Sequence, residues 1–120
     1  MKIAVSSTGK DLNASVDQRF GRAEYFLIID SETMDFEVIE NTQIVNVPQG
    51  AGIQTAKTVA DKNVDVLLTG SCGPKAFNAL NRVGIKVYTG AAGSIADAVN
   101  KFKNNELSQA NGPDVEGHWV

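Results

Sequence analysis

The chain has 120 residues, a length typical of one domain. Its 11 basic and 14 acidic residues give a formal net charge of −3, and no basic run occurs, which argues against binding along a nucleic-acid backbone. No apolar stretch approaches the roughly 18 residues of a membrane-spanning helix, and the start, MKIAVSSTGK, is too polar for a signal peptide. The single cysteine excludes an internal disulfide and a multi-cysteine zinc site, and fits a cytoplasmic protein.

The first third of the chain predicts three strands. A short apolar run, KIAVSS at 2–7, predicts the first strand, and EYFLIID at 24–30 predicts a buried second strand. DFEVIEN at 35–41 alternates apolar and acidic residues, so we expect it to form an antiparallel hairpin with 24–30, near the sheet edge. The polar segment 8–23 is expected to be a long irregular loop, and long loops inside compact domains are often functional.

From residue 50 onward the sequence predicts helices that alternate with strands. In chain order these are helix 50–63, strand 64–70, helix 73–84, strand 85–90 and helix 93–107. Pro74 in a first turn and Gly84 after an end are typical helix boundaries, and Ser94 is a typical N-cap. We therefore expect an α/β domain over 1–107, with a mixed five-stranded sheet and three helices, and an irregular tail over 108–120.

Glycine-rich turns precede all three predicted helices. The residues concerned are Gly50, Gly52, Gly70, Gly73, Gly90, Gly93 and Ser94. Unpaired amides at helix starts attract anions, and turns after parallel strands form the usual ligand crevice of open α/β sheets. We expect the three starts to converge on an anionic ligand. The alternative is that the glycines only permit tight turns, and no turn matches a Walker A or G-x-G-x-x-G motif.

The loop segment VDQRFGRA contains two candidate anion-binding side chains, Arg19 and Arg22. A guanidinium group is well suited to oxyanions, and the loop should emerge at the same end of the sheet as the helix starts. The alternative interpretation is a surface loop held by a pair between Asp17 and an arginine, with Phe20 in the core. Lys75 falls in the first turn of its predicted helix, where a cation is slightly unfavourable unless an anion lies nearby.

Cys72 and His118 are the two candidate metal ligands. A thiol just before a helix N-terminus has a lowered pKa, and thiolate is a soft ligand for molybdenum–sulfur or iron–sulfur species. The alternative is that Cys72 is a small buried core residue. A thiol-dependent enzyme would need a histidine base, and His118 lies in the predicted tail, where it is either idle or completes a cofactor site.

Two segments of the chain carry a family resemblance, DQRFGRAEYFLIID at 17–30 and GAGIQTAKTVADKNVDVLLTGSCGPKAFNALNRVGIKVYTG at 50–90. With the spacing between them, they resemble the dinitrogenase iron–molybdenum cofactor biosynthesis family over about residues 2–104. The resemblance implies a ribonuclease H-like α/β domain. It implies a non-enzymatic protein, related to nitrogen fixation, that binds or carries iron–molybdenum cofactor or a related metal–sulfur cluster, with cofactor-assembly proteins as partners. The RFGRA match points to Arg19, Phe20, Gly21 and Arg22. The helix-start matches point to Gly50, Gly52, Gly70, Gly73 and Pro74. Membership does not imply ligation by Cys72.

The leading hypothesis is therefore a cytoplasmic carrier for an anionic metal–sulfur cluster, without a nucleic-acid or membrane partner. A bulky anion that supplies its own sulfides needs only amide donors, one or two arginines and a soft contact. The alternative hypothesis is a module that binds another small anion or a partner protein without metal. A thiol-dependent enzyme that uses Cys72 is the third.

Overall fold

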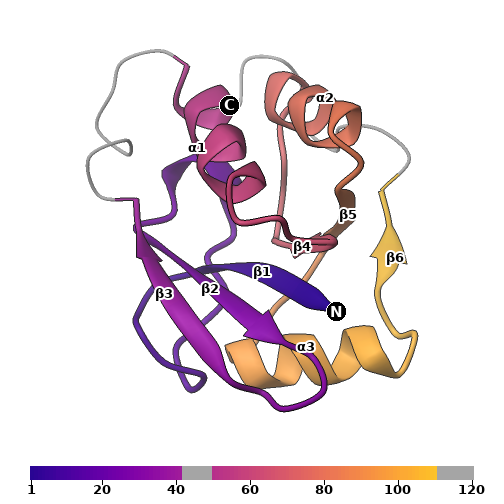
Figure 1. The fold of residues 1–120 in the computed structure, drawn as a ribbon. Helices are drawn as coiled ribbons and strands as arrows, with labels where there is room; N and C mark the ends of the chain where they lie inside the picture. Colours follow the sequence, from indigo (N-terminus) through magenta and orange to yellow (C-terminus); the bar gives the residue numbers. More distant parts are fainter. Residues whose placement is uncertain (42–49, 111–120) are drawn as a thin grey trace.

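The computed structural model describes residues 1–41 and 50–110, and these form one mixed sheet covered by helices on both faces (Figure 1). The strands are β1 (Lys2–Ser7), β2 (Tyr25–Asp30), β3 (Phe36–Glu40), β4 (Val66–Leu68), β5 (Lys86–Thr89) and β6 (Ser108–Gln109). The helices are α1 (Ala51–Ala60), α2 (Pro74–Arg82), α3 (Ile95–Lys103) and the short 3₁₀ helix η1 (Phe20–Arg22). Figure 1 shows α1 and α2 together on one side of the sheet and α3 on the other. The predicted α/β class and the three helices are confirmed.

The strand order is β3-β2-β1-β4-β5-β6, which places β3 at an edge as predicted. β1, β2 and β3 pair antiparallel, whereas β1, β4 and β5 pair parallel. This combination confirms the predicted hairpin followed by parallel strands. The crossover from β4 through α2 to β5 joins two parallel neighbours, as a βαβ unit requires.

The predicted strand count of five is wrong for the described residues, because β6 adds a sixth strand. Ser108 pairs with Thr89 in antiparallel register, and the Ala110 amide donates to the Val87 carbonyl at 2.8 Å. Ser108 and Gln109 therefore form a strand, although the prediction placed them in an irregular tail. Ser108 and Gln109 are too few to show the alternation that predicts a strand. They form a strand because they pair with the free edge of β5. The helix expected over 93–107 ends earlier, at Lys103.

Two hydrophobic clusters lie on opposite faces of the sheet. Ala4 faces the cluster beneath α1 and α2, whereas its neighbours Ile3 and Val5 face the cluster beneath α3, and all three are fully buried. Burial on both faces explains why β1 and β2 read as continuous apolar runs without alternation. The ribonuclease H-like label and the division at residue 107 stay predictions.

The loop over 8–23 is held to the domain at several points. The Val16 amide donates to the Gly93 carbonyl at 2.9 Å, and the Asp17 amide donates to the Ser6 carbonyl at 2.8 Å. Phe20 is 2% exposed and packs edge-on against Phe26, with ring centroids 5.3 Å apart. The loop is thus ordered by tertiary contacts and contains η1, which its polar sequence does not predict.

Candidate functional site: an anion-binding cleft

A cleft of about 280 Å³ opens where the loop after β1 meets the first turns of α1 and α2. Its lining residues are Gln18, Arg19, Phe20, Gly21, Arg22, Gly52, Gly70, Ser71, Gly73 and Ala76. The cleft lies beyond the carboxyl ends of β1 and β4, which are adjacent parallel strands. The chain leaves these two strands in different directions, so this is the position where open α/β sheets bind ligands.

The arginine-bearing segment is joined to the turn after β4 by hydrogen bonds. The Phe20 amide donates to the Ser71 carbonyl at 3.2 Å, and the Ser71 hydroxyl donates to the Gln18 carbonyl at 2.8 Å. Arg19 and Ser71 therefore run side by side as an isolated parallel bridge. Two segments separated by about fifty residues in the sequence form one wall of the cleft.

Asp17 orders this segment through the backbone. Its Oδ1 atom accepts from the Arg19 amide at 3.0 Å. The ion pairs within residues 1–41 and 50–110 are Lys10–Glu40 and Lys62–Glu37, so no carboxylate of those residues neutralises the Arg19 guanidinium. Asp17 and Arg19 form no side-chain ion pair with each other in the described part of the chain, and the exposed Arg19 side chain lines the cleft.

Glycines allow the walls of the cleft to approach one another closely. A Cβ atom on Gly21 would lie 3.0 Å from the Gly52 Cα and 3.1 Å from its nitrogen. A Cβ atom on Gly52 would lie 3.3 Å from the Ala76 Cβ. These contacts bring η1 against the first turn of α1, and α1 against the first turn of α2. The sequence pattern indicates Gly52 only as a helix-start donor. Its contact with Gly21 has one local signal, the lack of a side chain at both positions.

The first turns of α1 and α2 carry amides that are not used elsewhere in the described chain. The N-cap residues Gly50 and Gly73 provide no side-chain cap. Within residues 1–41 and 50–110, no carbonyl or side chain accepts from the amides of Gly52, Ile53 or Lys75. Gly52 and Gly73 line the cleft, whereas Gly50 precedes it with a φ of 78°. Two positive helix ends are thus directed to one place.

The start of α3 is different, and the predicted convergence of three helix starts is wrong for this one. The Ile95 amide donates to the Ala14 carbonyl at 2.9 Å, and the Ala96 amide donates to the Leu12 carbonyl at 3.0 Å. Ser94 is the N-cap as predicted and accepts from the Asp97 amide at 3.1 Å. The amides of this helix start are therefore satisfied within the chain.

The turn that carries Gly90 and Gly93 does not line the cleft. Both glycines have positive φ, 77° and 81°, so they serve the turn as the alternative interpretation proposed. The segments TGSCGPKA at 69–76 and TGAAGSIA at 89–96 share the pattern T-G-x-x-G-x-x-A. The pattern encodes a strand-to-helix turn, but not the face of the sheet to which the helix crosses. α2 packs on one face and α3 on the other.

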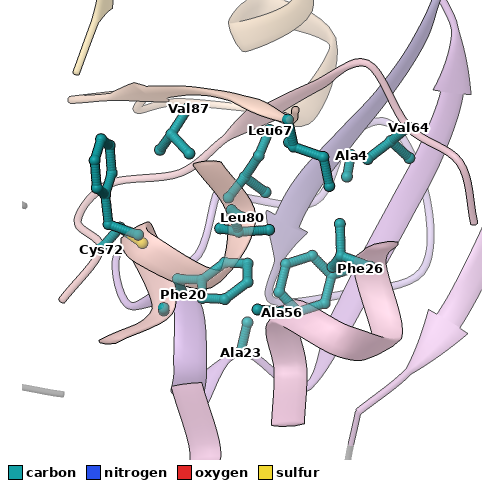
Figure 2. Close-up of a cluster of buried hydrophobic side chains, with 14 of the residues drawn as sticks. Ala4, Phe20, Ala23, Phe26, Ala56, Val64, Leu67, Cys72, Leu80 and Val87 are labelled. Atoms are coloured by element: carbon teal, nitrogen blue, oxygen red, sulfur yellow. The ribbon is translucent and has the colours of Figure 1, made fainter. Parts of the chain in front are cut away.

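Cys72 lies in the hydrophobic cluster beneath α1 and α2. It is 1% exposed, and Figure 2 shows its side chain in the same cluster as Phe20 and Leu80. Its Sγ atom lies 3.8 Å from the Gly73 carbonyl oxygen. This position agrees with the packing interpretation, and ligation of metal by Cys72 stays a prediction. His118, the other candidate ligand, lies outside the described residues.

The part of the chain that the structure describes contains no group of three His, Cys, Asp or Glu side chains arranged to hold a metal ion. None of its helices combines the length and the apolar character needed to cross a membrane. The residues that line the cleft offer guanidinium and amide N–H donors beside apolar residues.

Comparison with known proteins shows likeness over nearly the whole chain. It is similar to the apo form of the orange protein from Desulfovibrio gigas, with 40% identity and a TM-score of 0.92, over 95% of this chain and 96% of that protein. It is also similar to a Thermotoga protein described as a NifB candidate, with 36% identity and a TM-score of 0.79, over 90% and 91% of the two chains.

An uncharacterised protein of Methanocaldococcus jannaschii is 31% identical over 100 residues, which are 81% of this chain and 84% of that protein. The model of the dinitrogenase iron–molybdenum cofactor family matches residues 1–105. This match covers η1, the first turns of α1 and α2, and every residue that lines the cleft. The chain belongs to the dinitrogenase iron–molybdenum cofactor family.

Proposed function

We propose that this protein is a cytoplasmic, non-enzymatic carrier for an anionic iron–molybdenum or molybdenum–sulfur type cluster. Membership of a family defined by the dinitrogenase iron–molybdenum cofactor supports this class of cargo. The similarity to a protein described in an apo form supports reversible binding of a ligand. A carrier in cofactor assembly also implies assembly proteins as partners.

The observation that carries the proposal is the arrangement of donors around the cleft. Arg19 and Arg22 line it, and the uncapped first turns of α1 and α2 meet there. A helix start carries about half a positive charge, and two such ends beside guanidinium groups favour a multiply charged anion. The contrast with α3, whose amides are used internally, makes this more than a general property of the fold.

The donor set also suits cargo that must be released. A metal–sulfur cluster presents sulfides that accept hydrogen bonds, so amide and guanidinium N–H groups can hold it without a protein–metal bond. Ala76, Gly52 and Phe20 add apolar contact beside these donors. Non-covalent retention of this kind allows faster dissociation than thiolate ligation, which agrees with the burial of Cys72.

A titration under anaerobic conditions tests the proposal, with tetrathiomolybdate as a defined molybdenum–sulfur probe. We expect stoichiometric binding at micromolar concentration and a shift of the visible spectrum. Arg19→Ala should weaken binding about 10- to 150-fold, because a charge-assisted hydrogen bond contributes roughly 1.5–3 kcal/mol. Lys86→Ala is the matched control, since Lys86 is exposed and outside the cleft. Folded protein that leaves the spectrum unchanged would contradict the proposal.

The alternative is a cleft for another small anion, because the same donors also bind phosphate and carboxylate groups. A thermal-shift screen of phosphorylated metabolites and carboxylates separates the two functions. A compound that stabilises the protein in the absence of metal, and requires Arg19 to do so, would favour the alternative. Stabilisation by tetrathiomolybdate alone would favour the carrier.

A further inference from the structure

The side chain of Asn41 joins two elements that form the cleft, although Asn41 itself does not line it. Its Nδ2 atom donates to the Ala23 carbonyl at 2.9 Å and to the Thr55 hydroxyl oxygen at 3.1 Å. Its backbone amide donates to the Glu24 carbonyl at 2.7 Å. Ala23 directly follows η1, and Thr55 belongs to α1. One side chain just after β3 therefore connects η1 with α1.

The hydrogen bonds of this connection lie in the protein interior. Asn41 is 1% exposed, and Ala23 and Thr55 are fully buried. A hydrogen bond that is shielded from water is stronger than one at the surface, and a buried polar network makes its surroundings rigid. The connection therefore fixes the spacing between the end of η1 and the first turns of α1.

The orientation of the Asn41 amide is determined by these partners. Both hydrogens of its NH₂ group are used, one for the Ala23 carbonyl and one for the Thr55 hydroxyl oxygen. Within residues 1–41 and 50–110, no donor reaches the Oδ1 atom. Turning the amide over would place Oδ1 against the Ala23 carbonyl oxygen, and two acceptors repel each other. Only one orientation of the side chain keeps both bonds.

Arg22 lies between two residues that are held against α1. On one side, Gly21 packs so closely that a Cβ atom on it would lie 3.0 Å from the Gly52 Cα. On the other side, the carbonyl of the next residue is bound through Asn41 to Thr55. Gly52 and Thr55 are one turn apart on the buried face of α1. Because Arg22 lines the cleft, both attachments determine where its backbone lies relative to the helix start.

We propose that Asn41 and Thr55 are positioning residues that hold Arg22 beside the first turn of α1. A guanidinium group binds an anion through directional N–H donors, so a small displacement of its backbone lowers affinity although the charge is unchanged. This inference rests on the proposed anion-binding function. It identifies the interior contacts that set the spacing between the donors of the arginine segment and those of the helix.

Two substitutions of Thr55 separate placement from stability. Thr55→Val keeps the shape of the side chain but removes the oxygen that accepts from Asn41, whereas Thr55→Ser keeps the oxygen and removes a buried methyl group. Both variants lose stability, one through a hydrogen bond and the other through packing. We expect Thr55→Val to weaken tetrathiomolybdate binding about fivefold or more, and Thr55→Ser to change it less than about threefold.

Combined variants test whether the effect passes through Arg22. In an Arg22→Ala background, Thr55→Val should weaken tetrathiomolybdate binding less than about twofold further, because the group that it displaces is gone. Thr58→Val is the matched control: Thr58 lies in the same helix, but its hydroxyl donates to the Gln54 carbonyl at 3.1 Å. This control should change binding less than about threefold. Additive effects of Arg22→Ala and Thr55→Val, or equal weakening by Thr55→Val and either Thr55→Ser or Thr58→Val, would overturn the proposal.

A measurement without cargo keeps this proposal separate from the carrier function. In the full chain labelled with ¹⁵N, Thr55→Val should shift the amide signals of Gly21, Arg22 and Ala23, whereas Thr55→Ser and Thr58→Val should leave them nearly unchanged. If the original protein does not bind tetrathiomolybdate, the carrier proposal fails, and these shifts alone decide whether Thr55 places the arginine. Unchanged signals of the three residues in Thr55→Val would overturn the positioning role, whatever the probe does.

Discussion

Gly21→Ala should destabilise the protein, because the added methyl group meets backbone that cannot rotate away. Its Cβ atom would lie 3.0 Å from the Gly52 Cα and 3.1 Å from the Gly52 nitrogen. Overpacking of this kind costs about 1–3 kcal/mol. Relief requires η1 to move away from α1, which would also displace the adjacent arginines from the helix start.

Gly52→Ala is the comparison variant at the other residue of the Gly21–Gly52 contact, and its added methyl group lies against α2. Its added methyl group would meet a side-chain atom, the Ala76 Cβ, at 3.3 Å. Gly52 is the second residue of α1, and alanine is favoured over glycine in a helix interior by about 1 kcal/mol. The helical gain offsets most of the steric cost, so we expect a net change near zero.

Urea denaturation followed by far-ultraviolet circular dichroism measures both variants. Gly21→Ala should lower the free energy of unfolding by about 1–3 kcal/mol without changing the m-value, and should weaken binding of tetrathiomolybdate. Gly52→Ala should unfold close to the midpoint of the original protein. Equal stability of Gly21→Ala and the original protein would contradict the predicted clash with Gly52, as would a larger loss of stability for Gly52→Ala than for Gly21→Ala.

Three further predictions follow from burial and hydrogen bonding. Native Cys72 should react with iodoacetamide far more slowly than the urea-unfolded chain, and Cys72→Ala should retain tetrathiomolybdate binding within about threefold, because the thiol is 1% exposed; rapid native alkylation or abolished binding would contradict its packing role. Leu80→Ala should cost about 2–5 kcal/mol in urea denaturation, since Leu80 is fully buried; a loss below 1 kcal/mol would contradict its place in the core. The Glu32 and Thr33 amides donate hydrogen bonds that lower the pKa of Asp30. Its contribution to the free energy of unfolding should therefore be present above the ordinary pKa near 3.8 and be lost as pH falls through the lowered pKa. Asp30→Asn should reduce this fall in stability at low pH, and an unchanged fall would contradict the assignment.

Much of the fold follows from local sequence patterns. Apolar runs predicted β1 and β2, alternation predicted β3 at an edge, and Pro74 and Ser94 marked the starts of α2 and α3. These features are local because the backbone geometry of each element and its burial dictate the residue period. The arginine-bearing loop and the starts of α1 and α2 could be assigned to one end of the sheet for the same reason, since the carboxyl ends of parallel strands share an edge.

Other features depend on contacts between segments distant in sequence, so no local pattern indicates them. The pattern around Gly90 and Gly93 matches that before α2, yet α3 crosses to the opposite face, where the loop over 8–23 supplies acceptors for its first amides. β6 exists because the edge of β5 is available for pairing. Cys72 follows a strand that leads to the cleft, but its side chain turns into the core. Local residue patterns establish the elements and the donors available for an anion, whereas long-range packing establishes which of these donors surround one cleft.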